Sequence, residues 1–186
     1  MALDSGNVRV ARTGAISVGT AEAGAPTDAD TELGAGWTDL GWIGEDGVTE
    51  TRDRTTEKIR GWQNGETVRE VVTEATLSYV FKLVETKKET VELFYGATVD
   101  DTDGSLVVVP SATGGRQRFV IDVVDGDEYI RTYIPAGEIT EVGEQVYAAG
   151  EAVGYEVTIV AYPDVTAGGA AVKFYSALEV TVPVGG

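Results

Sequence analysis

The sequence contains no histidine and no cysteine among its 186 residues. It therefore has no imidazole base, no cysteine nucleophile, and no thiolate or imidazole ligand for a metal ion. The absence of cysteine excludes disulfide bonds, so we expect the chain to fold inside the cell. There is no apolar run of about 18 residues, as a membrane span requires, and the first residues lack the apolar core of a secretion signal.

Basic residues are scarce as well. The chain has 14 Lys and Arg against 31 Asp and Glu, a formal net charge of −17. Residues 132–172 contain no basic residue, although six acids lie there: Glu138, Glu141, Glu144, Glu151, Glu156 and Asp164. Binding to DNA requires cations that replace counterions along the phosphate backbone. The chain is therefore not a conventional nucleic-acid-binding protein, but its surface would repel DNA.

The acidic motifs do not form a recognisable catalytic or metal site. The segment VDDTDG at residues 99–104 would place Val99 and Pro110 where an EF-hand loop requires an oxygen ligand and a glutamate. Asp125 and Asp127 fall in a predicted hairpin turn, where aspartate is favoured for backbone reasons rather than as a glycosidase acid–base pair. We predict no enzymatic activity and no catalytic, cofactor-binding or metal-binding residue.

Most of the chain has the pattern of short β-strands separated by turns. Its 24 glycines and 42% hydrophobic content are typical of a β-rich domain. We expect strands at residues 37–43, 75–84, 105–109, 118–124, 128–134, 154–162 and 171–182. The one convincing helix spans residues 86–95, with a capping box formed by Thr86 and Glu89 and a C-terminal stop at Gly96. The predicted fold is mainly β (α+β), an antiparallel β-sandwich or barrel with one flanking helix.

The first 36 residues lack this pattern. They are rich in Gly, Ala, Thr and Asp and show no hydrophobic period. We expect residues 1–36 to form an extended segment outside the core, either an acidic surface loop or an interaction arm. Residues 37–186 are then expected to form a single β-sandwich domain.

Residues 45–66, EDGVTETRDRTTEKIRGWQNGE, combine strand-forming residues with almost nothing to bury. From Glu45 to Arg60 the only large apolar residues are Val48 and Ile59, whereas a strand normally buries one face. We predict a projecting polar β-arm that starts at an Asp46–Gly47 turn. Its edge and charges would meet another subunit, although a flexible solvated hairpin is the alternative.

The arm is also where cations are concentrated. The residues expected at subunit contacts are Arg52, Arg54, Lys58 and Arg60, with Trp62 as an apolar anchor. Cations on one projecting element of an acidic chain suggest attraction to an acidic face of the next copy. Trp62 has a second interpretation, as a core residue that returns the arm to the sheet.

One long stretch resembles a known family. Residues 36–96, GWTDLGWIGEDGVTETRDRTTEKIRGWQNGETVREVVTEATLSYVFKLVETKKETVELFYG, resemble the major tail proteins, or tail tube proteins, of bacteriophages with long non-contractile tails. The shared order is an aromatic strand ending in IG, an EDGVT turn, a charged arm closing on GWQ, a strand and a helix. FVIDVVDGDEYIRTYIPAGEITE and GYEVTIVAYPD resemble the second half of the family, so that the likeness covers about residues 37–165.

The resemblance implies a structural protein of the virion tail, assembled in the host cytoplasm. Homohexameric rings would stack into a tube that encloses the tape measure protein and conducts DNA into the host. Tail terminator and distal tail proteins would be further partners. Six copies would carry a formal charge of −102 (6 × −17), and an acidic lumen would let DNA pass without sticking. The acids expected to face the lumen are Asp122, Glu138, Glu141, Glu144, Glu151 and Glu156.

Other protein classes fit parts of the pattern. The main alternative is a monomeric β-sandwich that binds carbohydrate or a cell surface, with calcium bound at residues 99–104. A carboxylate-based hydrolase, a tail terminator and a capsid decoration protein are further alternatives. The long polar arm favours the tube, because stacked rings require an element that reaches from one copy to another.

Overall fold

The computed structural model describes residues 5–178. In this range a 3-10 turn at Ser5–Asn7 precedes eight strands and one helix. The elements are β1 (Thr13–Gly19), β2 (Trp37–Asp39), β3 (Ile43–Arg60), β4 (Thr67–Leu83), α1 (Lys88–Tyr95), β5 (Gln117–Asp125), β6 (Glu128–Val142), β7 (Tyr155–Ala161) and β8 (Val172–Tyr175). All pairings between strands are antiparallel. The mainly β fold with a flanking helix is confirmed, while the last part of the strand expected at residues 171–182 lies outside the described residues.

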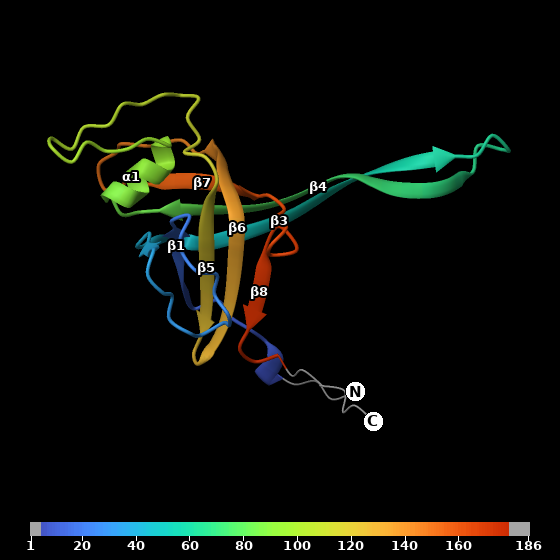
Figure 1. Ribbon diagram of the computed structural model, residues 1–186, viewed down its shortest axis with the longest axis horizontal. Helices are drawn as coiled ribbons and strands as arrows, with labels where there is room; N and C mark the ends of the chain where they lie inside the picture. The colour runs from blue at the N-terminus through green and yellow to red at the C-terminus, as the bar shows by residue number, and fades with distance from the viewer. Residues whose placement is uncertain (1–4, 179–186) are drawn as a thin grey trace.

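The strands form one sheet that bends into two layers. Their order is β2-β1-β5-β6-β7-β4-β3, with β8 also paired to β6. Residues 128–134 of β6 pair with β5, whereas residues 137–142 pair with β7. Figure 1 shows β5, β6 and β8 running across the direction of β3, β4 and β7. The core between the layers contains Ile16, Phe119, Ile134, Phe81, Val157 and Ile159.

Helix α1 packs beside the sandwich, close to β7 (Figure 1). Its buried residues are Thr90, Leu93 and Phe94. Gly96 ends the helix in the left-handed conformation with φ of 60°, as the sequence predicted. The predicted capping box is wrong, because Lys87 occupies the N-cap and makes no side-chain cap bond. The Thr86 hydroxyl is instead hydrogen-bonded to the Tyr155 hydroxyl at 3.0 Å.

The first 36 residues contribute directly to the fold. Strand β1 pairs with β5 along its whole length, and Ile16 is fully buried. The following loop is fastened to β6, since the Arg131 guanidinium donates a hydrogen bond to the Thr31 carbonyl at 2.6 Å. Ala23 and Ala29 of this loop are also buried. The expectation that residues 1–36 lie outside the core is therefore wrong for β1 and for the loop that follows it.

Three further predictions about local secondary structure are also wrong. The strand expected at residues 37–43 is interrupted after Asp39, and Gly41 has a positive φ of 84°. Residues 46 and 47 do not form a turn but lie within β3, where the register shifts between Ile43 and Val48 and Gly47 has φ of 66°. Between these two pairs β3 has three more residues than β4, an irregularity of the pairing that the strand passes through without ending. The strand expected at residues 105–109 is absent, and these residues belong to the loop between α1 and β5.

Candidate self-assembly surfaces

A long β-hairpin projects from the body of the molecule (Figure 1). Strands β3 and β4 pair from Val48–Phe81 out to Arg60–Thr67. Strand β7 pairs with β4 only over Leu77–Leu83, so that beyond Leu77 the hairpin has no third strand. We call residues 52–76 the distal hairpin. The predicted arm is confirmed, but it includes the first ten residues of β4, which the sequence analysis had not assigned to it.

The register of the two strands sorts the charges of the distal hairpin onto opposite faces. Residues directly opposite one another in an antiparallel pair lie on the same face. The basic face carries Arg52, Arg54, Lys58, Arg60 and Glu70, a formal charge of +3. The acidic face carries Asp53, Glu57, Glu74 and Arg69, a formal charge of −2. The alternation of acids and bases in the sequence thus becomes a separation of charge in space.

The cations of the distal hairpin form no salt bridge with any residue that the structure describes. The hairpin holds five of the 14 basic residues: Arg52, Arg54, Lys58, Arg60 and Arg69. Seven of the nine others form salt bridges with carboxylates: Arg9, Arg12, Lys87, Lys88, Arg116, Arg131 and Lys173. Every residue from 52 to 60 is exposed. The charge pattern of the hairpin is therefore free to interact with a second molecule.

Trp62 lies at the tip of the distal hairpin, in the turn that joins β3 to β4. Its side chain is 98% exposed, so it is not a core residue that returns the hairpin to the sheet. The turn closes through a hydrogen bond of 2.8 Å from the Gly61 amide to the Glu66 carbonyl. Asn64 and Gly65 both have a positive φ, which aspartate, asparagine and glycine tolerate best. An indole held in this position can contact only another molecule.

The base of the hairpin is fixed to the body. Lys173 of β8 forms a salt bridge with Glu50 of β3, close to the point where the third strand ends. Tyr79, which lies opposite Glu50, is almost completely buried. Burial, followed by the negative charge of Glu50, raises the pKa of the Tyr79 hydroxyl well above its usual range. The hairpin thus leaves the body from a packed base, which fixes its direction.

Five of the six acids predicted to face a lumen gather on β6, β7 and the loop between them. Glu138 lies opposite Val160 and Glu141 opposite Thr158, whereas the alternate residues Ile139 and Ile159 point into the core. Glu156 is exposed on the same outer side of β7. Glu144 and Glu151 are exposed in the connecting loop. The register therefore brings these acids to one surface, which we call the glutamate surface.

Asp122 does not belong to that surface. It lies on β5 opposite Arg131, and its two carboxylate oxygens accept hydrogen bonds of 2.7 and 3.0 Å from the Arg131 guanidinium. The Arg131 side chain is only 6% exposed. Bidentate pairing of this kind neutralises the carboxylate and fixes its geometry. Asp122 is therefore part of the packing between β5, β6 and the loop at residues 20–36.

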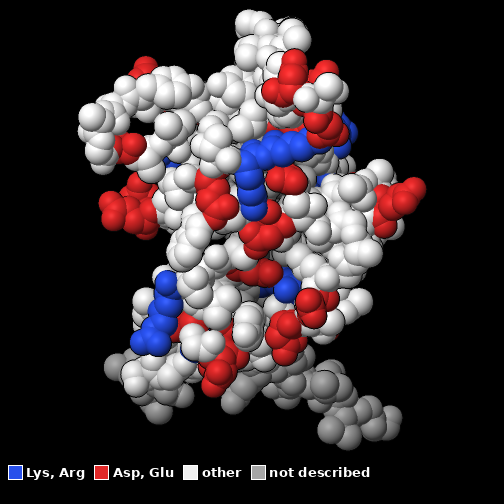
Figure 2. Space-filling view, turned by 90° about the vertical axis from the view of Figure 1, so that its left-hand side faces the viewer, with Lys and Arg blue, Asp and Glu red and all other residues white. Residues whose placement is uncertain are grey.

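The end of the body opposite the distal hairpin is predominantly acidic. Figure 2 shows acidic side chains spread over this face, with basic side chains at only a few places. The loop between α1 and β5 contributes Asp100, Asp101 and Asp103. A backbone hydrogen bond from Thr102 lowers the pKa of Asp100, and a side-chain hydrogen bond from Ser105 lowers that of Asp103. The Asp100 and Asp103 carboxylates thus stay charged to lower pH than ordinary aspartates.

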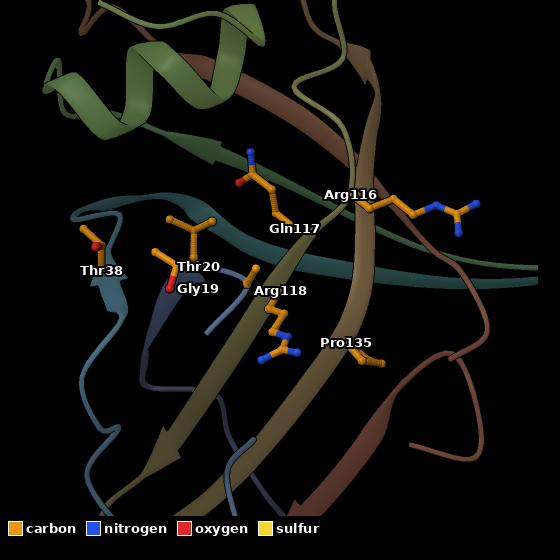
Figure 3. A pocket seen from close by; sticks show the side chains of 9 residues that line it. Gly19, Thr20, Thr38, Arg116, Gln117, Arg118 and Pro135 are labelled. Carbon is orange, nitrogen blue, oxygen red and sulfur yellow. The ribbon is translucent and has the colours of Figure 1, made fainter. Parts of the chain in front are cut away.

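The two arginines that line a cavity of the body belong to separate contacts. One cavity of about 450 Å³ is lined by Arg116 and Arg118 and by no acid. Figure 3 shows that these two side chains point in different directions. Arg116 lies over the Tyr162 ring at 4.3 Å, and Arg118 donates a hydrogen bond to the Ala23 carbonyl. They do not converge on one point, as the binding of an anion would require.

The described residues 5–178 show neither a metal-binding cluster nor a membrane-spanning helix. They contain no group of three or more His, Cys, Asp or Glu that could hold a metal ion. Their single helix, α1, is too short to cross a membrane. The features that stand out are therefore surfaces, namely the charge-sorted distal hairpin, the glutamate surface and the acidic end.

One solved structure shows the same fold, and two others match with lower scores. A chain of the PVC sheath–tube complex, from an extracellular contractile injection system in its extended state, matches with a TM-score of 0.52 at 11% identity and covers 94% of both chains. A chain of a native gene transfer agent virion matches at 0.40 and 12% identity, covering 78% of this chain and 92% of that one. A chain of the anti-feeding prophage tube-terminating cap matches at 0.45 and 10% identity, covering 86% and 89%.

The comparison with protein families covers almost the whole sequence. No curated protein matches the chain significantly. The family model described as phage tail tube protein matches residues 1–177, which include the distal hairpin, the glutamate surface and all eight described strands. The sequence resemblance is thereby confirmed at the level of the family, whereas the non-contractile class of tail stays a prediction. The chain belongs to the phage tail tube protein family and is a structural component of the virion tail.

Proposed function

We propose that this tail tube protein assembles into homohexameric rings that stack into a tube, and that the distal hairpin joins one copy to the next. The observation that carries the proposal is the basic face, where four exposed cations of a strongly acidic chain have no salt-bridge partner among residues 5–178. A ring requires a heterologous interface, in which two different surfaces of the chain meet. The basic hairpin and the acidic end of the body are two such surfaces.

The glutamate surface is proposed to line the lumen of the tube. Its acids are Glu138, Glu141, Glu144, Glu151 and Glu156. Two cations lie beside it, Arg116, whose guanidinium is 4.0 Å from the Glu138 carboxylate, and Lys82, which lies opposite Glu156. A ring of such surfaces would repel phosphates along the whole channel, so DNA could slide through without binding. We leave Asp122 out of this proposal because Arg131 neutralises it.

The remaining partners follow from the same role. The tube would enclose the tape measure protein, and the tail terminator and distal tail proteins would close its two ends. We propose that the tail is of the long non-contractile type. These partners fit a subunit with two dissimilar ends, because stacked copies leave one surface of each kind unpaired at the ends of the tube.

Negative-stain electron microscopy of three purified proteins tests the role of the hairpin. The first is the natural sequence. The second exchanges neighbours between the two faces (Asp53→Arg, Arg54→Asp, Glu57→Lys, Lys58→Glu), which keeps the composition and the net charge but changes the basic face from +3 to −1. The third is the matched control Lys58→Glu with Glu70→Lys, which exchanges two directly opposed residues and leaves the face at +3.

We expect rings or tubes with a stain-filled channel from the natural sequence and from the control, and dispersed subunits from the face-exchange variant. Assembly of all three proteins to the same extent would contradict the role of the basic face but leave the tail tube role intact. Dispersed particles from all three, at every concentration, would favour the monomeric carbohydrate-binding module. Addition of calcium and glycans would then be the next experiment.

A further inference from the structure

The loop between α1 and β5 displays a segment that has the sequence of a strand but no strand to pair with. Residues 105–109, SLVVV, are rich in β-branched side chains, which favour strands. In the single chain, Val107 is 77% exposed, Val108 55% and Val109 48%. Three adjacent exposed valines are an unusual surface for a tip of a loop, where small polar residues prevail.

The backbone of this segment is unpaired as well. Among the backbone hydrogen bonds of the described loops, none involves the amides of residues 106–109 or the carbonyls of residues 106–108. The bonds that fix the loop lie on either side of it. The Asp100 amide donates to the Ser105 carbonyl at 2.8 Å, and the Ala112 amide donates to the Val109 carbonyl at 2.9 Å. A row of free donors and acceptors beside apolar side chains is what an added strand requires.

The ends of the loop are held together at its base. A Cβ on Gly96 would lie 2.6 Å from the Gly114 amide nitrogen, so the two glycines bring the backbone of the loop into close contact. Lys88 of α1 also pairs with Asp101. The loop is therefore anchored to the helix while its valines remain exposed. Figure 1 shows the loop projecting beside α1.

The described sheet offers two long free edges. One is the outer edge of β3, which has 18 residues, and the other is the outer edge of β4 over residues 67–76, where β7 no longer pairs. The charges favour β3, because Asp100, Asp101 and Asp103 precede the segment and Arg52, Arg54, Lys58 and Arg60 lie on β3. Residues 67–76 of β4 carry one cation, Arg69, and two acids, Glu70 and Glu74.

The loop and the distal hairpin of one chain lie at opposite ends of the molecule (Figure 1). We propose that residues 105–109 add as a strand to the free edge of β3 in the distal hairpin of a neighbouring copy. This inference rests on the proposed assembly through the hairpin. It identifies residues 105–109 as the segment of the neighbouring copy that the hairpin binds. The contact is heterologous, so it propagates from copy to copy.

Disulfide crosslinking tests the pairing, because the natural chain has no cysteine. One cysteine is placed in the loop, as Val107→Cys or Val108→Cys, since adjacent residues of a strand point to opposite faces. The second is placed on β3 as Asp53→Cys, Thr55→Cys or Glu57→Cys. The matched controls place it on β4 at the directly opposed positions, as Thr76→Cys, Glu74→Cys or Val71→Cys. These controls share the face, and Glu74 and Thr76 are exposed whereas Val71 is half-buried, but all three lie one strand, about 5 Å, farther from the edge of β3.

After oxidation of assembled protein, we expect a ladder of bands at multiples of 19.6 kDa from one loop position combined with β3 positions. The β4 controls should remain at the mass of one chain. Tubes without a ladder from any β3 position, or with equal ladders from β4, would overturn the pairing while leaving the tail tube role intact. Failure of the natural sequence to assemble at all would overturn both.

A backbone variant tests the same pairing independently. Val107→Pro with Val108→Pro removes two amide donors from the segment, whereas Val107→Thr with Val108→Thr keeps the donors and the β-branched shape. Because both positions are exposed in the single chain, neither variant should change its folding. We expect the proline variant to lose assembly and the threonine variant to retain it. Equal assembly of the two variants would overturn the proposal.

Discussion

The body and the distal hairpin share strands β3 and β4 but differ in the burial of their side chains and in the pairing of their charges. In the body part of β4, Tyr79, Phe81 and Leu83 are buried in alternation with more exposed residues. In the distal part, residues 67–76 are exposed apart from a half-buried Val71. Most cations of the body have salt-bridge partners, and those of the hairpin have none among the described residues. The body is therefore specified by its own core, whereas the partner that we propose for the hairpin is another copy of the chain.

The largest expected difference between the two regions is in the cost of truncating an apolar side chain. Phe119 is fully buried between the layers, so Phe119→Ala should lower the free energy of unfolding by about 3–5 kcal/mol. Ile59→Ala in the hairpin removes a half-exposed side chain and should change it by less than about 0.5 kcal/mol. Urea unfolding of the two variants measures both values. Similar losses from the two would show that the hairpin has a core of its own.

The second prediction concerns charge. Asp122→Ala leaves the buried guanidinium of Arg131 without its carboxylate, which should cost about 3 kcal/mol, the lower end for such a pair, because Asp122 keeps some exposure to water. Asp53→Ala removes an exposed carboxylate of the hairpin that forms no salt bridge, and should leave the stability unchanged. Thermal or urea unfolding compares the variants. A loss below about 1 kcal/mol for Asp122→Ala would return this residue to the candidates for the lumen.

A smaller effect is expected where the two layers of the body approach most closely. Gly137 lies at the bend of β6, where a Cβ would come within 2.7 Å of Phe119 and 2.9 Å of Ile159. Gly137→Ala should therefore cost about 1–3 kcal/mol through overpacking. Gly44→Ala is the control, since its nearest neighbour would be the Lys82 carbonyl oxygen at an ordinary 3.5 Å. An unchanged free energy of unfolding in Gly137→Ala would mean that the bend tolerates a wider separation of the layers.

The sequence predicted the body well wherever apolar residues alternate. The period of two in residues 75–84 located the inner part of β4, and the Asp125–Gly126–Asp127 turn located the hairpin of β5 and β6. The same rule failed for β1, because Ile16 and Val18 stand among Gly, Ala and Ser, and their burial depends on β5, about 100 residues away. Local pattern contains no information on a partner at that distance.

The candidate surfaces were predictable only in part. The sequence located the charged arm, but the sorting of its charges depends on the register with residues 67–76, which the β-bulges in β4 shift. Likewise, Asp122 could not be separated from the glutamates before its register with Arg131 was known. The one signal available was that Arg131 is the last cation before a stretch of 41 residues without any. A lone arginine within an apolar strand suggests a buried ion pair.

The smallest expected effect on the fold is at the tip of the hairpin, where a substitution tests assembly without changing the body. Trp62 is 98% exposed, so Trp62→Phe should change the free energy of unfolding of the single chain by less than about 0.5 kcal/mol. Trp42→Phe, at 75% exposure on the body, is the matched control. If the tip is an anchor in the tube, the tryptophan emission of the natural protein shifts to shorter wavelength on assembly, and Trp62→Phe loses that shift while Trp42→Phe retains it. An unchanged shift in Trp62→Phe would mean that the tip stays in water after assembly, which would leave the edge and the basic face of the hairpin as its contacts.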